Sequence, residues 1–426
     1  MYLDIIEDLF KIYLACIDSY NAKIYQTIND KYTIIDRSML TVYQYIKIIE
    51  DRKEKNEENL NVLKNYLIKQ TIYSETGNIV FEIENKSKVG LYSEILDDLV
   101  IEKFLYKNRL MKKLKFNYTK IVSDKYTELL FFLELISEFS ILKKLIINGN
   151  YEAKYKFEII KNRIINYSIN ENDYFYKEKK EYINLIKNDT FFEGEYSNLN
   201  LVALNLRDVY RFSQCSLIKS ENVLHHQYSV TIMSIIFVEY CNNVLNEKID
   251  LYSIITKALF HDFGEYKGTE IISHFKYYNE DSKKMFAEIE EKDEKDLEKR
   301  IGHNLYNIIS NYKNDKEGYM VDYIDKIIGI MKLWVETGYF NNYTIIKTIN
   351  AVYQERFKKF LKIKNMDGII NKEFFVDFLR EYYIYIKENL VENNLKYTLK
   401  YFTEEEINDF RTEIKTLKTN PQKFLI

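Results

Sequence analysis

The scarcity of proline and glycine constrains the fold of this chain more than any other feature of its sequence. Its 426 residues include one proline, Pro421, and 11 glycines. A proline inside a helix removes a backbone hydrogen bond, and a glycine there costs backbone entropy, so both residues tend to interrupt helices. Their rarity predicts an all-α protein with long helices, and the length allows two domains or three.

Charge composition argues against binding to duplex nucleic acid. The 62 Lys and Arg residues nearly balance 65 Asp and Glu residues, which leaves a net charge of -3. Duplex binders usually need a basic face to neutralise phosphates. We therefore expect no clear duplex nucleic-acid surface.

The hydrophobic segments favour a cytoplasmic protein without a membrane span. No stretch reaches 18 apolar residues, and the best candidate, Leu129 to Ile147, is interrupted by two glutamates and two lysines. The N-terminus carries acidic residues where a secretory signal needs Lys or Arg. Three cysteines, widely spaced and odd in number, are typical of a reduced compartment.

The chain divides into three parts by pattern. Residues 1–190 are predicted to form a mostly helical N-terminal domain of unknown function. The segment Asn188 to Asn200 is the best linker candidate, because it is rich in Asn, Ser, Thr and Gly and lacks a helical period. A second helical domain is expected over 197–395, followed by a helix and tail over 396–426. Within the second domain, the charged segment 280–300 predicts a solvated helix that buries Met285, Phe286 and Ile289.

A cluster of histidines marks the second domain as the one that carries chemistry. Four of the chain's five histidines lie between His225 and His274, and one of them belongs to the doublet His261-Asp262. The doublet continues an apolar helical stripe that includes Ile254 and Ala258, so both side chains should point inward before Gly264 ends the helix. A buried ionised aspartate is costly unless it is paired or binds a metal.

Helical phase points to two further candidates. Asp325 lies four residues after Val321 and three before Ile328, so it should face inward, whereas Asp322 should be solvated. His226 lies on an apolar face of a helix for which Asn222 is a plausible N-cap. Phase alone does not choose between His226 and its neighbour His225.

Two histidines and two aspartates would make a competent divalent-metal shell. Imidazole and carboxylate ligands suit Mn, Co, Fe, Ni, Zn or Mg and exclude a thiolate zinc site. The alternative is structural, because an inward histidine is often a hydrogen-bonded core residue and an inward aspartate is often a cap or an ion-pair partner.

Ordered motifs across about a third of the chain resemble a known family. From Arg211 to Gly338 the sequence resembles the bacterial 5′-deoxynucleotidase branch of the HD superfamily of metal-dependent phosphohydrolases. The matching segments are, in order, Arg211-Phe212, Glu221-Asn222-Val223-Leu224-His225-His226, His261-Asp262-Phe263-Gly264-Glu265, Phe275-Lys276-Tyr277, Ile289-Glu290, Asp325, Glu336 and Gly338. An HD doublet alone is a weak signal, but this ordered set is more specific.

The resemblance implies a fold, a site and a role for each site residue. The fold would be a compact helical HD bundle that forms a homodimer. The implied metal ligands are His226, His261, Asp262 and Asp325. Arg211 would clamp the substrate phosphate and Glu265 would orient or deprotonate the attacking water. Glu270 stands where the family has an aspartate near the substrate sugar.

Three departures from the family pattern concern the substrate and the surroundings of the metal. Phe212 replaces a tryptophan that recognises the sugar, which puts a preference for deoxyribose in doubt. His225 replaces a glutamate; we expect it to be exposed or to support a ligand, and the alternative is a spare ligand. His274 replaces a proline and is expected in a surface loop, with substrate contact as the alternative.

The expected function is release of phosphate from nucleoside 5′-monophosphates by a divalent-metal-dependent phosphohydrolase. Two alternatives stay open. One is another HD chemistry, either hydrolysis of deoxynucleoside triphosphates or of cyclic nucleotides. The other is a protein-interaction module that senses a nucleotide without turning it over.

Overall fold

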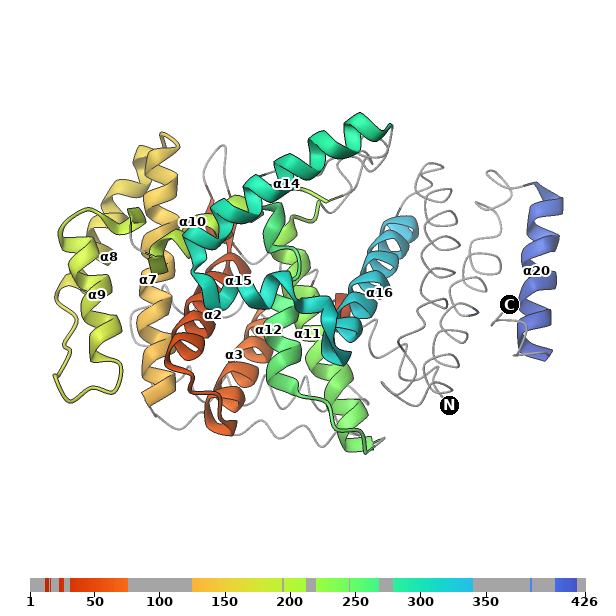
Figure 1. Cartoon of the computed structure of the whole chain (residues 1–426), viewed down its shortest axis with the longest axis horizontal. Helices are drawn as coiled ribbons and strands as arrows, with labels where there is room; N and C mark the ends of the chain where they lie inside the picture. The colour runs from red at the N-terminus through yellow and green to blue at the C-terminus, as the bar shows by residue number, and fades with distance from the viewer. Residues whose placement is uncertain are drawn as a thin grey trace.

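A computed structural model of the chain describes residues 12–14, 16, 23–26, 31–75, 125–193, 195–211, 220–244, 246–267, 279–339, 384 and 403–419 (Figure 1). The elements before residue 208 are β1 (Lys23–Gln26), β2 (Lys31–Thr33), α2 (Ile34–Arg52), α3 (Glu57–Glu75), α7 (Lys125–Ile147), η1 (Tyr151–Ala153), α8 (Lys154–Ile165), α9 (Tyr176–Lys187), η2 (Phe191–Glu193) and α10 (Glu195–Arg207). Those that follow are α11 (Val223–Val244), α12 (Leu251–Phe260), η3 (Phe263–Lys267), α14 (Glu280–Ile301), α15 (His303–Ser310), η4 (Tyr312–Asn314), α16 (Lys316–Tyr339) and α20 (Glu404–Thr419).

The all-α prediction is confirmed over these ranges. The described β-structure consists of the antiparallel hairpin β1–β2, which the sequence analysis did not predict, and an isolated bridge between Tyr210 and Asn222. Helix α2 follows the hairpin without a break, because a capping box between Thr33 and Asp36 satisfies backbone N–H groups at its start.

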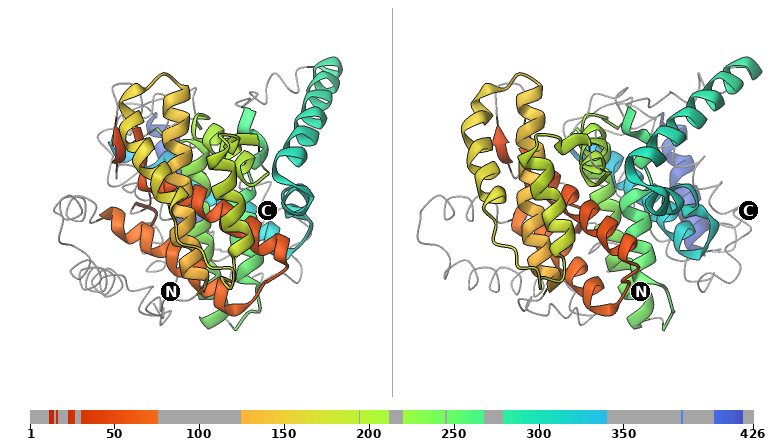
Figure 2. Two further views of the ribbon diagram at one scale, coloured as in Figure 1. Left: turned by 90° about the vertical axis from the view of Figure 1, so that its left-hand side faces the viewer. Right: turned by 60° about the vertical axis from the view of Figure 1, so that its left-hand side comes forward.

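The core forms where N-terminal helices meet the helices of the predicted second domain. Helix α2 packs on α7, α10 and α11, while α11 packs on α12 and α16 (Figures 1 and 2). Almost the whole length of α2 is buried, including most of its polar residues. The division into domains at 1–190 and 197–395 stays a prediction, but α2 lies in direct contact with helices on the other side of that boundary.

The segment from Asn188 to Asn200 is structured rather than an extended linker. It contains η2 and the first residues of α10. The ring of Phe191 is fully buried and packs edge-on against Phe139 of α7. A single buried aromatic side chain thus anchors a stretch whose polar composition is typical of a loop.

Helix α14 occupies the predicted charged segment, but the prediction of its buried side was wrong for Met285 and Ile289, while Phe286 is half-buried. The helix projects away from the other helices (Figure 2). Met285 is 51% exposed and Ile289 is 38% exposed. Its buried apolar residues are Leu297 and Ile301, at the end that adjoins α15 and α10.

None of the helices that the structure describes combines the length and the apolar character that crossing a bilayer requires.

Candidate metal centre

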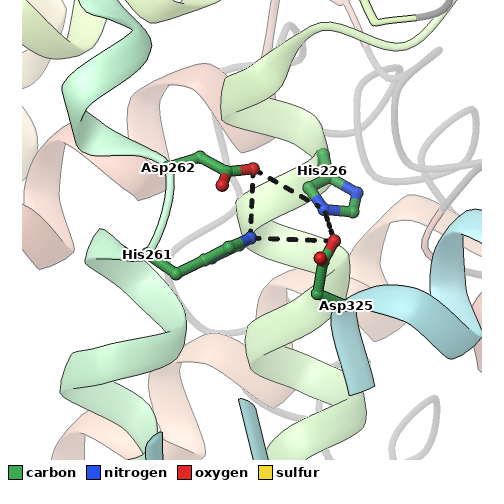
Figure 3. A group of neighbouring side chains, drawn as sticks. All are labelled: His226, His261, Asp262 and Asp325. Atoms are coloured by element: carbon green, nitrogen blue, oxygen red, sulfur yellow. Dashed lines mark hydrogen bonds and ion pairs between the residues drawn. The ribbon is translucent and has the colours of Figure 1, made fainter. Parts of the chain in front are cut away.

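Three separate elements bring the four predicted metal ligands together. Helix α11 contributes His226, the turn after α12 contributes His261 and Asp262, and α16 contributes Asp325 (Figure 3). One ligand atom from each residue lies within 4.8 Å of the others. We refer to these four residues as the ligand cluster. Their convergence is the geometry expected of a site for a single ion.

The side chains of the ligand cluster form a closed ring around a common centre (Figure 3). Nε2 of His226 lies 2.8 Å from Oδ1 of Asp325 and 3.9 Å from Oδ2 of Asp262. Nε2 of His261 lies 3.1 Å from the same oxygen of Asp262 and 4.0 Å from Oδ1 of Asp325. Two nitrogens and two oxygens therefore alternate around the ring, so every neighbouring pair is a histidine and a carboxylate.

The His261-Asp262 doublet points inward as predicted, but the helix before it ends earlier than predicted. Helix α12 ends at Phe260, and His261 is its C-cap with helical backbone angles. The inward stripe therefore continues for one more residue before the chain enters η3. Gly264 does not end the helix: it lies inside η3, and its backbone lacks the positive φ of a glycine cap.

A second hydrogen bond fixes the ring of His261 in an orientation that suits a metal ligand. Its Nδ1 lies 2.8 Å from the carbonyl oxygen of Ala258, so Nδ1 carries the proton and donates it there. In the neutral ring this leaves the lone pair on Nε2, the buried atom that faces the other ligands. A hydrogen bond of this kind from the far ring nitrogen is typical of metal-bound histidines.

A buried carboxylate lies behind the other histidine. Glu221 is fully buried, and its Oε2 lies 3.8 Å from Nδ1 of His226. A carboxylate behind a ligand histidine orients the ring and increases its basicity. In the sequence Glu221 is only one member of a motif, and its position behind His226 was not predicted.

Arg211 lies beside the ligand cluster. One guanidinium nitrogen is 3.1 Å from Oδ2 of Asp262 and another is 3.7 Å from Oδ1 of Asp325. Its backbone N–H donates to the carbonyl of Glu221, which holds the segment against the start of α11. Burial disfavours the charged guanidinium, but the surrounding carboxylates, including Glu265, outweigh burial and raise the pKa of Arg211.

The same charges keep both aspartates ionised. Burial opposes ionisation of Asp262, but His261 and Arg211 outweigh burial and lower its pKa to about 2. Burial also opposes ionisation of Asp325, and interactions with His226 and Arg211 hold its pKa well below the usual value. A metal ligand must be deprotonated, and both carboxylates meet this requirement at neutral pH.

The two histidines respond differently to this field. Burial and the nearby charge of Arg211 lower the pKa of His226. Burial has the same effect on His261, but the carboxylates of Asp262 and Asp325 outweigh it and raise its pKa to about 9. The two carboxylates of the cluster therefore favour positive charge at the position of His261.

The remaining predicted site residues are only partly covered by the structure. Glu265 lies in η3, three residues after Asp262, and is half-buried. Phe212 and Glu270 lie outside the described residues, as does His274. Their predicted contacts with substrate stay predictions.

His225 is buried, so of its two expected positions the exposed one was wrong, and support of a metal ligand stays a prediction. Its Nε2 lies 3.0 Å from Oδ1 of Asp36, in α2. It is not one of the four residues of the ligand cluster. Helical phase cannot reveal this position, because the partner is 189 residues away in the sequence.

Asp322 lies outside the cluster, as predicted, but it is not freely solvated. Its carboxylate pairs with Lys313 at 2.9 Å and with Lys326 at 2.5 Å, and its side chain is only 13% exposed. The element η4 folds back against α16 and brings Lys313 there.

Element η4 also places the half-buried ring of Tyr312 edge-on to His261, with ring centroids 6.4 Å apart. Nothing in the local sequence pattern indicated that Tyr312 would lie there.

Comparison with known proteins gives a family match for the segment that carries this site. Residues 199–382, somewhat under half of the chain, match the model of the family described as 5'-deoxynucleotidase YfbR-like. No curated protein and no solved structure matches the chain. The matched segment contains the whole ligand cluster and Arg211. This match supports the resemblance of the segment to the HD superfamily of metal-dependent phosphohydrolases, near its 5′-deoxynucleotidase branch.

Proposed function

We propose that the protein is a divalent-metal-dependent phosphohydrolase that releases phosphate from nucleoside 5′-monophosphates. The observation that carries the proposal is the ring of two histidines and two ionised aspartates with Arg211 directly beside it. The family match supports a nucleotide substrate.

The donor set fits a divalent cation. The two imidazoles and two carboxylates of the ligand cluster would hold Mn, Co, Fe, Ni, Zn or Mg, and their number leaves positions open on such an ion. A bound ion of this kind polarises a phosphoryl oxygen and lowers the pKa of water.

Arg211 is placed to bind the phosphate. Its guanidinium has donors in a planar fork that can contact two phosphate oxygens at once. In the structure these donors face Asp262 and Asp325. A phosphate at this position would receive charge compensation on its equatorial oxygens, where phosphoryl transfer needs it.

Glu265 is the candidate for steering the attacking water. It is half-buried and close enough to Arg211 to contribute to the field at that side chain. A carboxylate at the edge of the site can accept a proton from water within hydrogen-bond reach. Tyr312 lies beside His261, where burial raises the pKa of its phenol to about 12, so it remains a neutral hydrogen-bonding group at neutral pH.

The test is phosphate release from a panel of nucleotides in the presence of Mn²⁺, Co²⁺ or Mg²⁺. We expect turnover of monophosphates and a loss of more than about 100-fold in Asp325→Asn, since changes behind a metal ligand already cost about 10–100-fold. Asp322→Asn is the matched control, because it removes a carboxylate from the same helix outside the ligand cluster. Absence of turnover with every metal, or equal turnover in both variants, would refute the proposal.

The products also separate the other HD chemistries. Tripolyphosphate would indicate triphosphate hydrolysis, and a ring-opened monophosphate would indicate a cyclic-nucleotide phosphodiesterase. A nucleotide complex that persists with metal and is never turned over would indicate a sensing module. Homodimer formation, implied by the resemblance, can be measured on the same preparation by sedimentation.

A further inference from the structure

A buried carboxylate from the N-terminal part of the chain contacts His225, the residue that precedes the metal ligand His226. Asp36 of α2 is fully buried, and its Oδ2 accepts hydrogen bonds from the backbone and hydroxyl of Thr33 at 2.7 and 3.0 Å. Its Oδ1 lies 3.0 Å from Nε2 of His225. The guanidinium of Arg207 lies 3.5 Å from Oδ2. One buried charge thus connects the start of α2 with two distant segments of the chain.

The two distant partners of Asp36, Arg207 and His225, lie close in sequence to residues of the site. Arg207 is the last residue of α10, four positions before Arg211, and His225 precedes the ligand His226. These two segments are also joined by backbone hydrogen bonds. Val223 donates to Val209, and Arg211 donates to Glu221, both at 2.9 Å. Asp36 therefore binds both of the hydrogen-bonded segments that carry Arg211 and His226.

Tyr43 makes a second connection from the same face of α2. It lies seven residues after Asp36, which is close to two helical turns. Its hydroxyl donates to Oε1 of Gln227 at 2.7 Å. Gln227 directly follows the ligand His226 in the sequence. The ring of Tyr43 packs against Phe260 and Phe263, the residues on either side of the doublet, with centroids 5.1 and 5.0 Å apart.

From these contacts we infer that α2 belongs functionally to the metal centre, with Asp36 and Tyr43 as positioning residues for His226, Arg211 and the His261-Asp262 doublet. The inference rests on the metal centre of the proposed function, but not on its substrate. It assigns a role to one helix of residues 1–190, for which the resemblance implies none.

The electrostatics of Asp36 agree with a fixed, ionised anchor. Complete burial raises the pKa of a carboxyl group. Here the interactions with His225, Arg207 and the Thr33 N–H outweigh burial, and the pKa of Asp36 lies below its usual value. An ionised buried carboxylate persists only when its partners stay in place, so it constrains their positions.

Metal affinity of the full-length protein tests the inference without any assay of turnover. Mn²⁺ is titrated calorimetrically into the metal-free wild type and into Asp36→Asn and Tyr43→Phe. We expect binding to be about tenfold weaker in Asp36→Asn, at the low end of the range for groups behind a ligand, and a smaller loss in Tyr43→Phe. The visible absorption of the Co²⁺-loaded protein should change in Asp36→Asn, because that spectrum reports coordination geometry.

Two controls make the same chemical changes as these variants at sites away from the ligand cluster. Asp173→Asn removes the partner of the buried Lys179 ammonium, away from α11. Tyr45→Phe removes a buried hydroxyl from the same helix, one that binds the carbonyl of Asn59. Both controls should retain the Mn²⁺ affinity and Co²⁺ spectrum of the wild type, even if they unfold more readily.

The outcomes are distinct. Wild-type affinity and spectrum in folded Asp36→Asn and Tyr43→Phe would overturn the inference, as would an equal loss in all four variants. If Asp36→Asn does not fold, the comparison of Tyr43→Phe with Tyr45→Phe decides. A wild type that binds neither ion overturns it as well. A wild type that binds Mn²⁺ without releasing phosphate would refute only the proposed substrate chemistry.

Discussion

Gly318, near the start of α16, allows an unusually close approach of η4. A Cβ atom added there would overlap the carbonyl group of Tyr312 and come within 3.1 Å of the Cα of Lys313. The backbone N–H of Gly318 also donates to Asp315, which caps the helix. We predict that Gly318→Ala destabilises the protein, although alanine is the better helix former.

The magnitude follows from two opposing contributions. Replacing glycine by alanine in a helix is worth about 1 kcal/mol. Overpacking costs about 1–3 kcal/mol, and the upper end applies because the obstacle is backbone. The carbonyl cannot retreat without moving η4, whose Lys313 pairs with Asp322 and whose Tyr312 packs on His261. The expected net loss is about 2 kcal/mol in the free energy of unfolding.

Urea denaturation followed by circular dichroism measures this difference. Gly264→Ala is the control, because a Cβ there meets nothing within 4 Å and the backbone has ordinary angles. It should be neutral or stabilising by about 0.4–1 kcal/mol. If Gly318→Ala proves as stable as the wild type, the close approach of η4 to α16 is not a feature of the folded protein.

Three further outcomes are expected. Mn²⁺ at 100 times its dissociation constant should raise the free energy of unfolding by about 2.7 kcal/mol. In thermal melts, a chelator should remove this gain and Asp325→Asn should not show it. Folding lowers the pKa of Asp36 from its usual value of 3.8, so its contribution is complete above that pH and declines as the pH falls through the folded-state pKa. Urea titrations should therefore show the stability gap between wild type and Asp36→Asn shrinking below about pH 4, and a gap that widens there would contradict the ionised anchor. Leu133→Ala, in the fully buried face of α7, should cost about 2–5 kcal/mol yet leave Mn²⁺ affinity in the folded protein unchanged, which calorimetry can check.

Sequence patterns identified the ligand cluster because its members depend on local geometry. Asp325 and the doublet lie on helical stripes whose other members are apolar, and a helix that buries those members carries the polar ones inward with them. Choosing His226 over His225 required the family resemblance. In the structure both rings are buried, and they differ in the partner they meet: Asp325 for one and Asp36 for the other.

The features that were missed depend on packing between distant segments. The start Thr33-x-x-Asp36 is readable as a helix cap, but nothing local indicates that the same carboxylate would bind His225 and Arg207. Met285 and Ile289 show the opposite error. Their spacing is helical, yet an apolar stripe does not specify whether another element covers it, and in α14 they are left exposed.

The spread of the ligand cluster along the chain has a consequence for the order of folding. His226 and Asp325 meet across 99 positions, and Asp36 meets His225 across 189. Contacts between such distant positions carry a large loop-closure entropy and tend to slow folding. Individual helices can form before these segments meet, but the complete ligand set cannot. The appearance of Mn²⁺ binding during refolding would therefore mark completion of the native topology rather than an early local event.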